Sequence, residues 1–568
     1  MYTRTRNIVR SLRMRMSRPS LGSLVSIVGW AVVCWVVLGW RLGYPSFWDP
    51  DEATYAETTR EMLAAHNWLV PTYGGHPFFD KPPLFYMLQM ASFAVGGATE
   101  LAARSVPALS ALALVGVVAW FGRSLFNRDV GRTGALMFAV LPATFALSSY
   151  AILDMTFTLF LFGGAAMVTV AAVNDRPRLQ YPGYVLLAAA VLTKGPLALV
   201  LAGLAFLLSL ALAPDARAPL RRLRWGVGLL IIVALSVPWF IYMWRRFGDA
   251  FVDGYVFKEN LSLYARPLYG GQPSYLFYAQ VMATGLLPWT PLLAGRLVDA
   301  FRGFRITAAE RLLWAWAIAV IGFFSFSSFK LDHYVFPAAP ALCLLCARAW
   351  DEARRAERPP VGILAGIAAI PLLLLIAGVV MIPGLDRVPL DLPAAARLLP
   401  IALIAGGLAM AGQVAHRWRP SPVPFAPVAA LLAAYAVVIT IGFPAFEEMK
   451  PTRRLALIVA TTALPDDHVA TFRLNRWSSS WRFYVGRHSE ALETPGQMRR
   501  FLARPGRHYC AMMRRDYDRL TSEGMRLRII HEESGVFSTT GRAMSSGRAR
   551  RDQFIVVTEE RPPNPAGT

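Results

Sequence analysis

Long apolar segments recur along almost the whole of this 568-residue chain, and they limit what it can fold into. Many of them approach the roughly 20 residues that an α-helix needs to cross the hydrocarbon core of a bilayer. The chain is 55% hydrophobic and its mean hydropathy is +0.41, which is typical of membrane proteins and not of soluble domains. The pattern predicts an all-α, polytopic membrane domain.

Basic residues indicate how the apolar segments are oriented. Residues 1–20 are rich in arginine and contain no acid, so we expect them in the cytoplasm, followed by a retained signal anchor at 21–42. The arginine-rich loop 121–132 falls on the same side only if the apolar stretch that ends at Val95 lies in the interface instead of crossing. This choice predicts 13 spans, with the N-terminus inside and the C-terminus outside; the later spans are 105–121, 131–149, 153–173, 181–194, 196–213, 225–244, 275–295, 311–328, 334–349, 361–382, 395–414 and 424–443.

Charge, cysteines and motifs exclude several classes of function. The net charge of +22 reflects basic cytoplasmic loops that contact anionic lipid, so we expect no nucleic-acid partner. The four cysteines imply no disulfide framework, and the Cys343–Cys346 pair lies in an apolar helix. The chain has no Walker-type phosphate loop, no GxGxxG after a strand and no HExxH, which argues against direct use of a soluble nucleotide.

The last part of the chain, residues 445–568, differs from the rest. Short runs of alternating apolar residues predict strands at 468–474, 481–486, 508–513, 526–531 and 553–558, with helices at 495–504 and 515–523. This pattern indicates a small soluble α/β domain outside the membrane. We expect a flexible basic loop at 540–552 and a disordered tail at 559–568.

The stretch FWDPDEATYAE (47–57) follows the first span and carries three acids. Asp49 fits a helix N-cap, Pro50 the first helical position and Glu52 the third, which would form a capping box. Asp51 then has no structural task, and it shares a helix face with Tyr55. Asp51 is therefore a candidate catalytic residue, the alternative being a further acid that stabilises the helix dipole.

Lys81 lies in the rigid segment Asp80-Lys81-Pro82-Pro83, from which it should project as a point-charge ligand for phosphate. The alternative is a lysine that reaches toward lipid headgroups. Asp154, at the start of a span, is a second catalytic candidate, or else an ordinary acid at a helix N-terminus. Lys194 follows a short apolar helix, where it either binds substrate or compensates the helix dipole.

The loop 245–274 combines tyrosines with basic residues, among them Lys258 and Arg266, and such a loop is suited to cover a sugar phosphate. Lys330 to Tyr334 again place charge and a tyrosine at a helix end. With 13 spans, all these groups reach the outer surface from distant parts of the chain. We therefore expect one site there.

The order of these motifs resembles the GT-C superfamily of membrane glycosyltransferases. The resemblance rests on the acidic pair after the first span, FFDKPPLFYMLQ, AILDMTF, LTKGPLA, GLLPW (285–289) and KLDHYVFPAAPAL (330–342). It is strongest to the bacterial aminoarabinose transferases of lipid A, which are related to protein O-mannosyltransferases. The resemblance implies a GT-C membrane domain at 21–444 and a periplasmic domain at 445–568.

The resemblance also implies roles for particular residues. Asp51, Tyr55, Lys81, Asp154, Lys194 and Tyr334 fall on positions that line the family's site, and Arg266 falls on its phosphate-binding arginine. Asp80 replaces a usual glutamate, and Asn260 replaces a histidine that, with a glutamate, supplies a metal site in the family. Asp80 and Glu259 are therefore the remaining metal candidates, and no other cofactor is implied.

The resulting prediction is an inverting glycosyltransferase in the bacterial inner membrane. It would move 4-amino-4-deoxy-L-arabinose from undecaprenyl phosphate to lipid A at the periplasmic face. A near alternative transfers a hexose or mannose to protein or another lipid. A distant alternative is a transporter or flippase of prenyl-linked sugars, which would be expected to place ionisable groups near the bilayer midplane.

Overall fold

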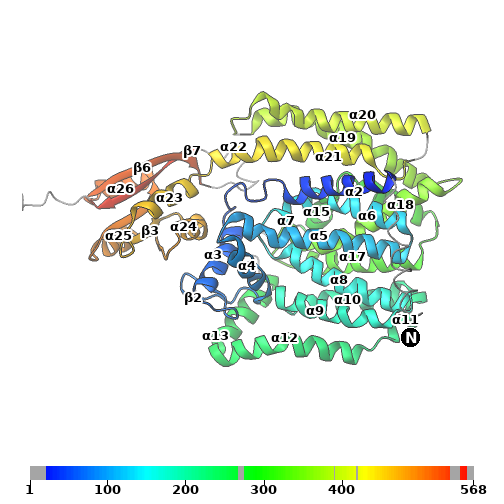
Figure 1. Ribbon diagram of the computed structural model, residues 1–568, viewed down its shortest axis with the longest axis horizontal. Coiled ribbons are helices and arrows are strands. Elements are labelled where there is room, and N and C mark those ends of the chain that lie inside the picture. Colours follow the sequence, from blue (N-terminus) through cyan, green and yellow to red (C-terminus); the bar gives the residue numbers. More distant parts are fainter. Residues whose placement is uncertain (1–20, 266–273, 389, 418–419, 538–550, 560–568) are drawn as a thin grey trace, which may run out of the picture.

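The computed structural model describes residues 21–265, 274–388, 390–417, 420–537 and 551–559, most of which are helical. The helices form a bundle with similarly directed axes, and a small sheet lies beyond one end of it (Figure 1). Seven described helical segments are long and apolar enough to cross a membrane. Five of them are single helices: α5 (Glu100–Leu125), α8 (Asp154–Val173), α12 (Trp225–Phe247), α17 (Ala308–Ser325) and α19 (Val361–Arg387). The other two are the segment Ala394–His416, most of which is α20 (Leu398–Arg417), and the segment Phe425–Glu448, which contains α21 (Phe425–Val437) and α22 (Phe443–Glu448).

Three further pairs of helices are long enough only if each is one bent span. These are α6 (Arg128–Ala139) with α7 (Pro142–Ser148), bent by 63°; α10 (Leu197–Leu212) with the segment Pro214–Arg221, bent by 113°; and α15 (Phe277–Gly285) with α16 (Thr290–Phe301), bent by 117°. The described residues thus contain seven to ten candidate spans, and the count of 13 stays a prediction.

Three shorter helices lie where the sequence predicts the remaining spans. α2 (Leu21–Cys34), α9 (Gln180–Lys194) and α18 (Ala339–Arg355) have 14, 15 and 17 residues, although each lies where a span is expected. α4 (Leu84–Gly96), with 13 residues, extends for only about 20 Å and is too short to cross a bilayer by itself.

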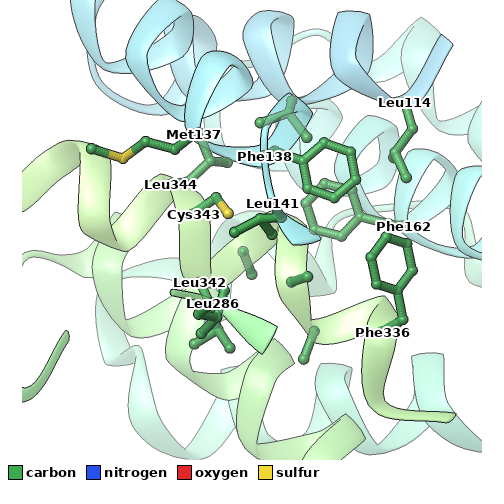
Figure 2. Close-up of a cluster of buried hydrophobic side chains, with 14 of the residues drawn as sticks. Leu114, Met137, Phe138, Leu141, Phe162, Leu286, Phe336, Leu342, Cys343 and Leu344 are labelled. Carbon is green, nitrogen blue, oxygen red and sulfur yellow. The ribbon is translucent and has the colours of Figure 1, made fainter. Parts of the chain in front are cut away.

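The core of the bundle is built from large apolar side chains that meet where α5, α6, α8 and α18 pack together. Figure 2 shows part of it, including Phe138 and Phe162, which are 0% and 2% exposed. Small residues allow the helix backbones to approach closely: a Cβ on Gly131 would lie 2.3 Å from the carbonyl oxygen of Ala119 on α5. This packing gives a rigid support for the loops at the ends of the helices.

The end of the bundle nearer the sheet carries several short elements, of which Figure 1 labels α3, β2, α4 and α13. They are α3 (Asp51–Ala64), the hairpin β1 (Thr72–Tyr73) and β2 (His76–Pro77), α4, α13 (Asp249–Phe251) with the π-helix η4 (Val252–Ser262), α14 (Leu263–Ala265), and the 3₁₀-helix η5 (Asp332–Ala338).

The C-terminal region is a five-stranded mixed sheet with helices on both faces. Its strand order is β4-β3-β5-β7-β6, in which β4, β3 and β5 are parallel and β7 is antiparallel to β5 and β6. The elements are α23 (Thr452–Thr462), β3 (His468–Phe472), α24 (Ser478–Val485), β4 (Glu490–Leu492), α25 (Pro495–Leu502), β5 (His508–Met513), α26 (Arg514–Ser522), β6 (Leu527–Val536) and β7 (Arg551–Glu559).

One predicted strand was wrong, because residues 481–486 lie largely in helix α24. Trp477, Trp481 and Val485 are spaced by four residues and pack together on one face of the sheet, as a helix requires. The alternation of apolar residues over 481–485 coincides with a strand pattern by chance. The short edge strand β4 was missed. The expected loop 540–552 and tail 559–568 lie largely outside the described residues, but residues 551, 552 and 559 belong to strand β7, so these bounds were wrong.

Candidate functional site

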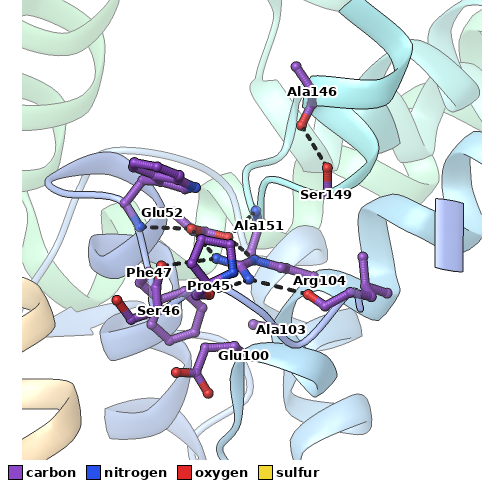
Figure 3. Close-up of polar contacts among 12 residues, drawn as sticks. Pro45, Ser46, Phe47, Glu52, Glu100, Ala103, Arg104, Ala146, Ser149 and Ala151 are labelled. Carbon is purple, nitrogen blue, oxygen red and sulfur yellow. Dashed lines mark hydrogen bonds and ion pairs between the residues drawn. The ribbon is translucent and has the colours of Figure 1, made fainter. Parts of the chain in front are cut away.

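A buried ion pair organises the loops from which the candidate residues project. Glu52 and Arg104 are 0% and 1% exposed, and the guanidinium donates to both carboxylate oxygens at 2.6 and 2.9 Å (Figure 3). Glu52 also accepts hydrogen bonds from the backbone amides of Trp48 and Ala151, each at 2.9 Å. Arg104 in turn donates to the carbonyl oxygen of Pro45 at 2.6 Å. The pair therefore ties the start of α3 to α5 and to the turn that precedes α8.

This arrangement corrects the predicted capping box. The residue before α3 is Pro50, which provides no side-chain cap, and the carboxylate of Asp49 instead accepts a hydrogen bond from Ser480 at 2.6 Å. Glu52 does accept a nearby backbone N–H, but its main partner is Arg104. The sequence could not indicate this partner, which lies 52 residues away.

Asp51 begins α3, and its side chain is exposed. Nearby protein nevertheless reduces its hydration and raises the pKa of its carboxyl; His333 opposes this shift, whereas the carboxylates of Asp154 and Asp80 add to it. Tyr55, one turn along α3, is half-buried and packs against Tyr86 with a ring separation of 5.7 Å. Asp51 therefore lies close enough to Asp80 and Asp154, which come from two other segments, for their charges to affect it.

Lys194 and Asp154 form a second buried pair. The ammonium lies 2.5 Å from the carboxylate Oδ1 and 4.6 Å from the centre of the Tyr334 ring. His333 lies 3.7 Å from the other carboxylate oxygen of Asp154. The end of α9, the start of α8 and the start of η5 meet here. The structure thus brings three of the predicted residues together and adds His333, which the sequence indicated only weakly.

Lys81 lies between two carboxylates. Its ammonium is 2.5 Å from Asp80 and 3.6 Å from Glu259 of η4. Burial and the neighbouring Asp80 carboxylate raise the pKa of Glu259 to about 7, although Lys81 opposes the shift. Burial also tends to raise the pKa of Asp80, but the adjacent Lys81 ammonium holds it below its usual value. Glu259 therefore changes charge near neutral pH, next to a lysine suited to phosphate.

A cavity of about 480 Å³, which we call the lysine cavity, is lined by Lys81, Lys194 and Tyr334 but not by Asp51, Tyr55 or Asp154. Its polar wall contains Lys81, Lys194, Glu259 and Tyr334, and its apolar wall contains Leu197, Val200, Tyr264, Phe323 and Phe324. Two ammonium groups next to an extended apolar surface are suited to a molecule with an anionic head and a hydrocarbon tail.

The two candidate metal ligands, Asp80 and Glu259, are not arranged as a metal site. Lys81 already lies between Asp80 and Glu259, and Asn260 donates its side-chain amide to the carbonyl oxygen of Tyr255 at 2.7 Å. Within the described residues, no three His, Cys, Asp or Glu side chains are grouped so as to hold a metal ion.

Arg266, the predicted phosphate-binding arginine, lies outside the described residues. Lys258 is described and is exposed.

The fold and the charged cavity at one end of the helices define a multi-pass membrane protein with a GT-C type fold. The structure superposes on ArnT from Cupriavidus metallidurans bound to undecaprenyl phosphate with a TM-score of 0.73. The match covers 94% of this chain and 98% of that chain at 22% sequence identity. This likeness confirms the predicted fold class, including the small C-terminal sheet region.

Sequence comparisons point in the same direction. The profile of the dolichyl-phosphate-mannose-protein mannosyltransferase family matches residues 23–253. Undecaprenyl phosphate-alpha-4-amino-4-deoxy-L-arabinose arabinosyl transferase 1 of Sodalis glossinidius is 33% identical over 310 residues, or 53% of this chain and 54% of that protein. The transferase of the same description from Serratia proteamaculans is 30% identical over 360 residues, or 61% of this chain and 62% of that protein. The chain thus matches little more than half the length of these relatives, and the resemblance to GT-C glycosyltransferases is confirmed.

Proposed function

We propose that this protein is an inverting glycosyltransferase of the inner membrane, with 4-amino-4-deoxy-L-arabinose as the sugar, undecaprenyl phosphate as its carrier and lipid A as the acceptor. The observation that carries the proposal is the lysine cavity, in which Lys81 and Lys194 face an apolar wall. The names of the matched relatives support the sugar and the carrier. The proposal places this end of the bundle and the C-terminal sheet in the periplasm, with the N-terminus in the cytoplasm.

In this proposal the donor binds with its phosphate against Lys81. The ammonium offers a localised positive charge in a site of low polarity, where its interaction with phosphate is stronger than in water. Lys194 is held by Asp154 and Lys81 by Asp80, each at 2.5 Å, so both ammonium groups donate hydrogen bonds and keep only part of their net charge. Arg266 is proposed as a further phosphate ligand, and Tyr334 and Tyr55 as residues that border the sugar. The prenyl chain follows the apolar wall between α10 and α17.

The reaction breaks the bond between the anomeric carbon and the phosphate oxygen, and the polyprenyl phosphate leaves with the bonding electrons. The acceptor oxygen attacks the opposite face of the sugar, which inverts the configuration. If the acceptor is a hydroxyl, its proton passes to Asp51, and the raised pKa of this carboxyl suits a general base. If the acceptor is an ionised phosphate, no base is required, and Asp51 orients the acceptor or binds the sugar amine.

A second candidate function keeps the donor site and changes the sugar and acceptor. The mannosyltransferase family profile covers the segments that contain Asp51, Lys81, Asp154 and Lys194, which favours transfer of a hexose to protein or another lipid as the alternative. A transporter is disfavoured, because the ionisable groups of the lysine cavity gather at one end of the helices.

Mass spectrometry of lipid A tests the proposal. Four strains are compared: one with the intact chain, one without it, one with Asp51→Asn and one with Asp518→Asn, an exposed control in α26. We expect a mass increase equal to one aminoarabinose in the intact and control strains, and at least a hundredfold less in the other two. Unmodified lipid A in every strain would refute the lipid A assignment, and transfer to other lipids or protein would then support the alternative.

A further inference from the structure

A cavity of about 330 Å³ lies among helices α8, α9, α10, α12 and α17, and we call it the α10–α12 cavity. Leu220 of the short helix α11 (Arg217–Arg221) lines it, and α11 lies at the end of the bundle away from the sheet (Figure 1). The α10–α12 cavity shares no lining residue with the lysine cavity. It is therefore separate from the proposed donor site.

The wall of the α10–α12 cavity is almost entirely hydrocarbon. No charged residue lines it, and its large side chains include Phe121, Phe162, Phe206 and Trp316. The side-chain donors in the wall all donate to protein oxygens, at 2.7–3.4 Å; they are Thr169, Tyr184, Ser209 and Trp225. Because these donors are already satisfied, the wall is suited to an alkyl chain and not to a polar molecule.

The cavity opens sideways between α10 and α12. Gly203 and Leu229 line it and are both exposed, Leu229 by 59%. A Cβ on Gly203 would meet no atom within 4 Å. The lining residues of α10 run from Leu199 to Ser209, which is about 15 Å of helix, or roughly half of the hydrocarbon core of a bilayer. This depth matches a chain that enters from one leaflet.

The turn between α10 and α12 carries four exposed arginines, which are Arg217, Arg221, Arg222 and Arg224. Arg221 directly follows Leu220, and Arg224 directly precedes Trp225; both of these neighbours line the cavity. The guanidinium groups of Arg221, Arg222 and Arg224 have no hydrogen-bond or ion-pair partner among the described residues. Uncompensated cations beside a hydrocarbon wall are suited to an anionic lipid headgroup.

The prenyl chain of the donor is another amphiphile that could enter this cavity, but the positions of the charges argue against it. The lysines of the lysine cavity and the arginines after α10 lie at opposite ends of the bundle. A prenyl phosphate has one anionic head, which is proposed to bind Lys81. The arginines therefore require a second anionic molecule.

We propose that the α10–α12 cavity binds an acyl chain of an anionic phospholipid, and that Arg221 and Arg224 hold its phosphate. The bound lipid fills the space between α10 and α12 and stabilises their packing against α8 and α17. Its leaflet is the one on the arginine side, which is cytoplasmic in the proposed topology. The lipid site itself does not depend on the proposed transferase function.

Titration of the full-length protein in detergent with phosphatidylglycerol tests this proposal, with native mass spectrometry to count the bound lipids. Phosphatidylethanolamine with the same acyl chains is the comparison lipid, because its headgroup has no net charge. Arg221→Gln and Arg224→Gln are compared with Arg358→Gln, an exposed arginine between α18 and α19. We expect the Kd of the first phosphatidylglycerol to rise about fivefold in each of the first two variants, the contribution of one arginine near a membrane surface, and to stay unchanged in the control.

Gly203→Phe tests the hydrocarbon part of the site. A ring at the opening between α10 and α12 should weaken the binding of phosphatidylglycerol about tenfold or more, because the acyl chain loses its buried contacts. Gly116→Phe on α5 is the matched control: Gly116 is also exposed, a Cβ there also meets no atom within 4 Å, and it does not line the cavity. Undecaprenyl phosphate binding, and the unfolding temperature without added lipid, should match those of the controls.

Equal affinity of the wild-type protein for the two phospholipids would overturn the proposal, as would an unchanged Kd in Arg221→Gln and Arg224→Gln. Displacement of phosphatidylglycerol by an equimolar amount of undecaprenyl phosphate would assign the cavity to the prenyl chain and would also overturn it. If Gly203→Phe lowers the unfolding temperature, the two arginine variants decide the outcome. Sugar transfer is measured separately, so a failure of the proposed transferase function is distinguished from a failure of the lipid site.

Discussion

Glu52 lies next to the catalytic candidate Asp51, but its buried ion pair with Arg104 gives it a structural role. Removing one partner of such a pair leaves an uncompensated buried charge, whereas removing both is much less harmful. Because Glu52 also accepts hydrogen bonds from the amides of Trp48 and Ala151, the pair fixes the backbone just before Asp51 and just before Asp154.

We expect Glu52→Gln to lower the free energy of unfolding by about 3–5 kcal/mol, since Arg104 keeps its charge in a site closed to water. Thermal unfolding in detergent measures the change. Asp518→Asn, which breaks an exposed pair with Arg514, should cost less than about 1 kcal/mol. Glu52→Gln combined with Arg104→Met should recover part of the loss; a double variant less stable than Glu52→Gln alone would contradict this explanation.

Glu259 makes donor binding dependent on pH. Its pKa is about 7, so below pH 7 the carboxyl is neutral, and Asp80 is then the neighbouring carboxylate that competes with the donor phosphate for Lys81. As the pH rises through 7, Glu259 ionises and competes with the donor for Lys81. The donor phosphodiester keeps a single charge throughout this range, so the carboxyl is the group that titrates.

The Kd of a prenyl phosphodiester should therefore increase several-fold between pH 6 and pH 8. Glu259→Gln should remove this dependence and hold the affinity near its value at pH 6, because a neutral amide cannot ionise. Titration calorimetry at three pH values measures both proteins. An identical slope in the variant would assign the pH dependence to another group.

At the scale of elements, the junction of α9 and α10 determines where Lys194 lies. Gly195 has φ +87° and ψ −167°, a conformation that side chains strongly disfavour, and a Cβ there would lie 2.1 Å from the hydroxyl of Tyr255. The glycine therefore lets η4 pack directly against the end of α9, which brings Glu259 and Lys194 to the same cavity.

Gly195→Ala should destabilise the protein by about 1–3 kcal/mol and weaken undecaprenyl phosphate binding at least tenfold, because both the backbone and η4 must shift. Adding Tyr255→Phe removes the hydroxyl and should restore part of the binding, while the backbone strain remains. Gly116→Ala on α5, where the added Cβ meets no atom within 4 Å, is the matched control. Wild-type affinity in Gly195→Ala would show that this contact does not position Lys194.

The sequence predicted elements well where a pattern had a local cause. Apolar segments located the helices of the bundle, and polar residues at helix ends located Asp51, Lys81, Asp154 and Lys194 near one another. The sequence did not predict contacts between distant parts of the chain. The partner of Glu52 lies 52 residues away, and that of Asp49 lies 431 residues away. The helical bends, such as the 117° between α15 and α16, also depend on packing between helices that no local pattern records.

At the scale of the whole molecule, the candidate site and the C-terminal sheet lie at the same end of the bundle (Figure 1). Our proposal places this end in the periplasm, because the opposite loops carry the arginines, including Arg217, Arg221 and Arg222. Topology is therefore a separate test of the proposed function.

Alkaline phosphatase fused after Glu559 should be active, and a green fluorescent protein fused there through the general secretion route should remain dark. Fusions after Arg222, between α11 (Arg217–Arg221) and α12, should give the reverse result. Enzymatic activity and fluorescence of intact cells measure both. Fluorescence at the C-terminus would place the lysine cavity in the cytoplasm and exclude a periplasmic reaction.

The loop after the first helix, around Ser46, is completed by Glu447 and Lys450 from much later in the chain. Ser46 donates both its amide and its hydroxyl to Glu447, at 2.9 and 2.7 Å, and Lys450 binds the carbonyl oxygens of the same loop. During synthesis, these partners leave the ribosome about 400 residues after the loop they bind. A chain interrupted before residue 447 would contain Asp51 and both lysines of the cavity but could not complete the Ser46 loop. Newly made protein can therefore complete this loop only after Lys450 has left the ribosome.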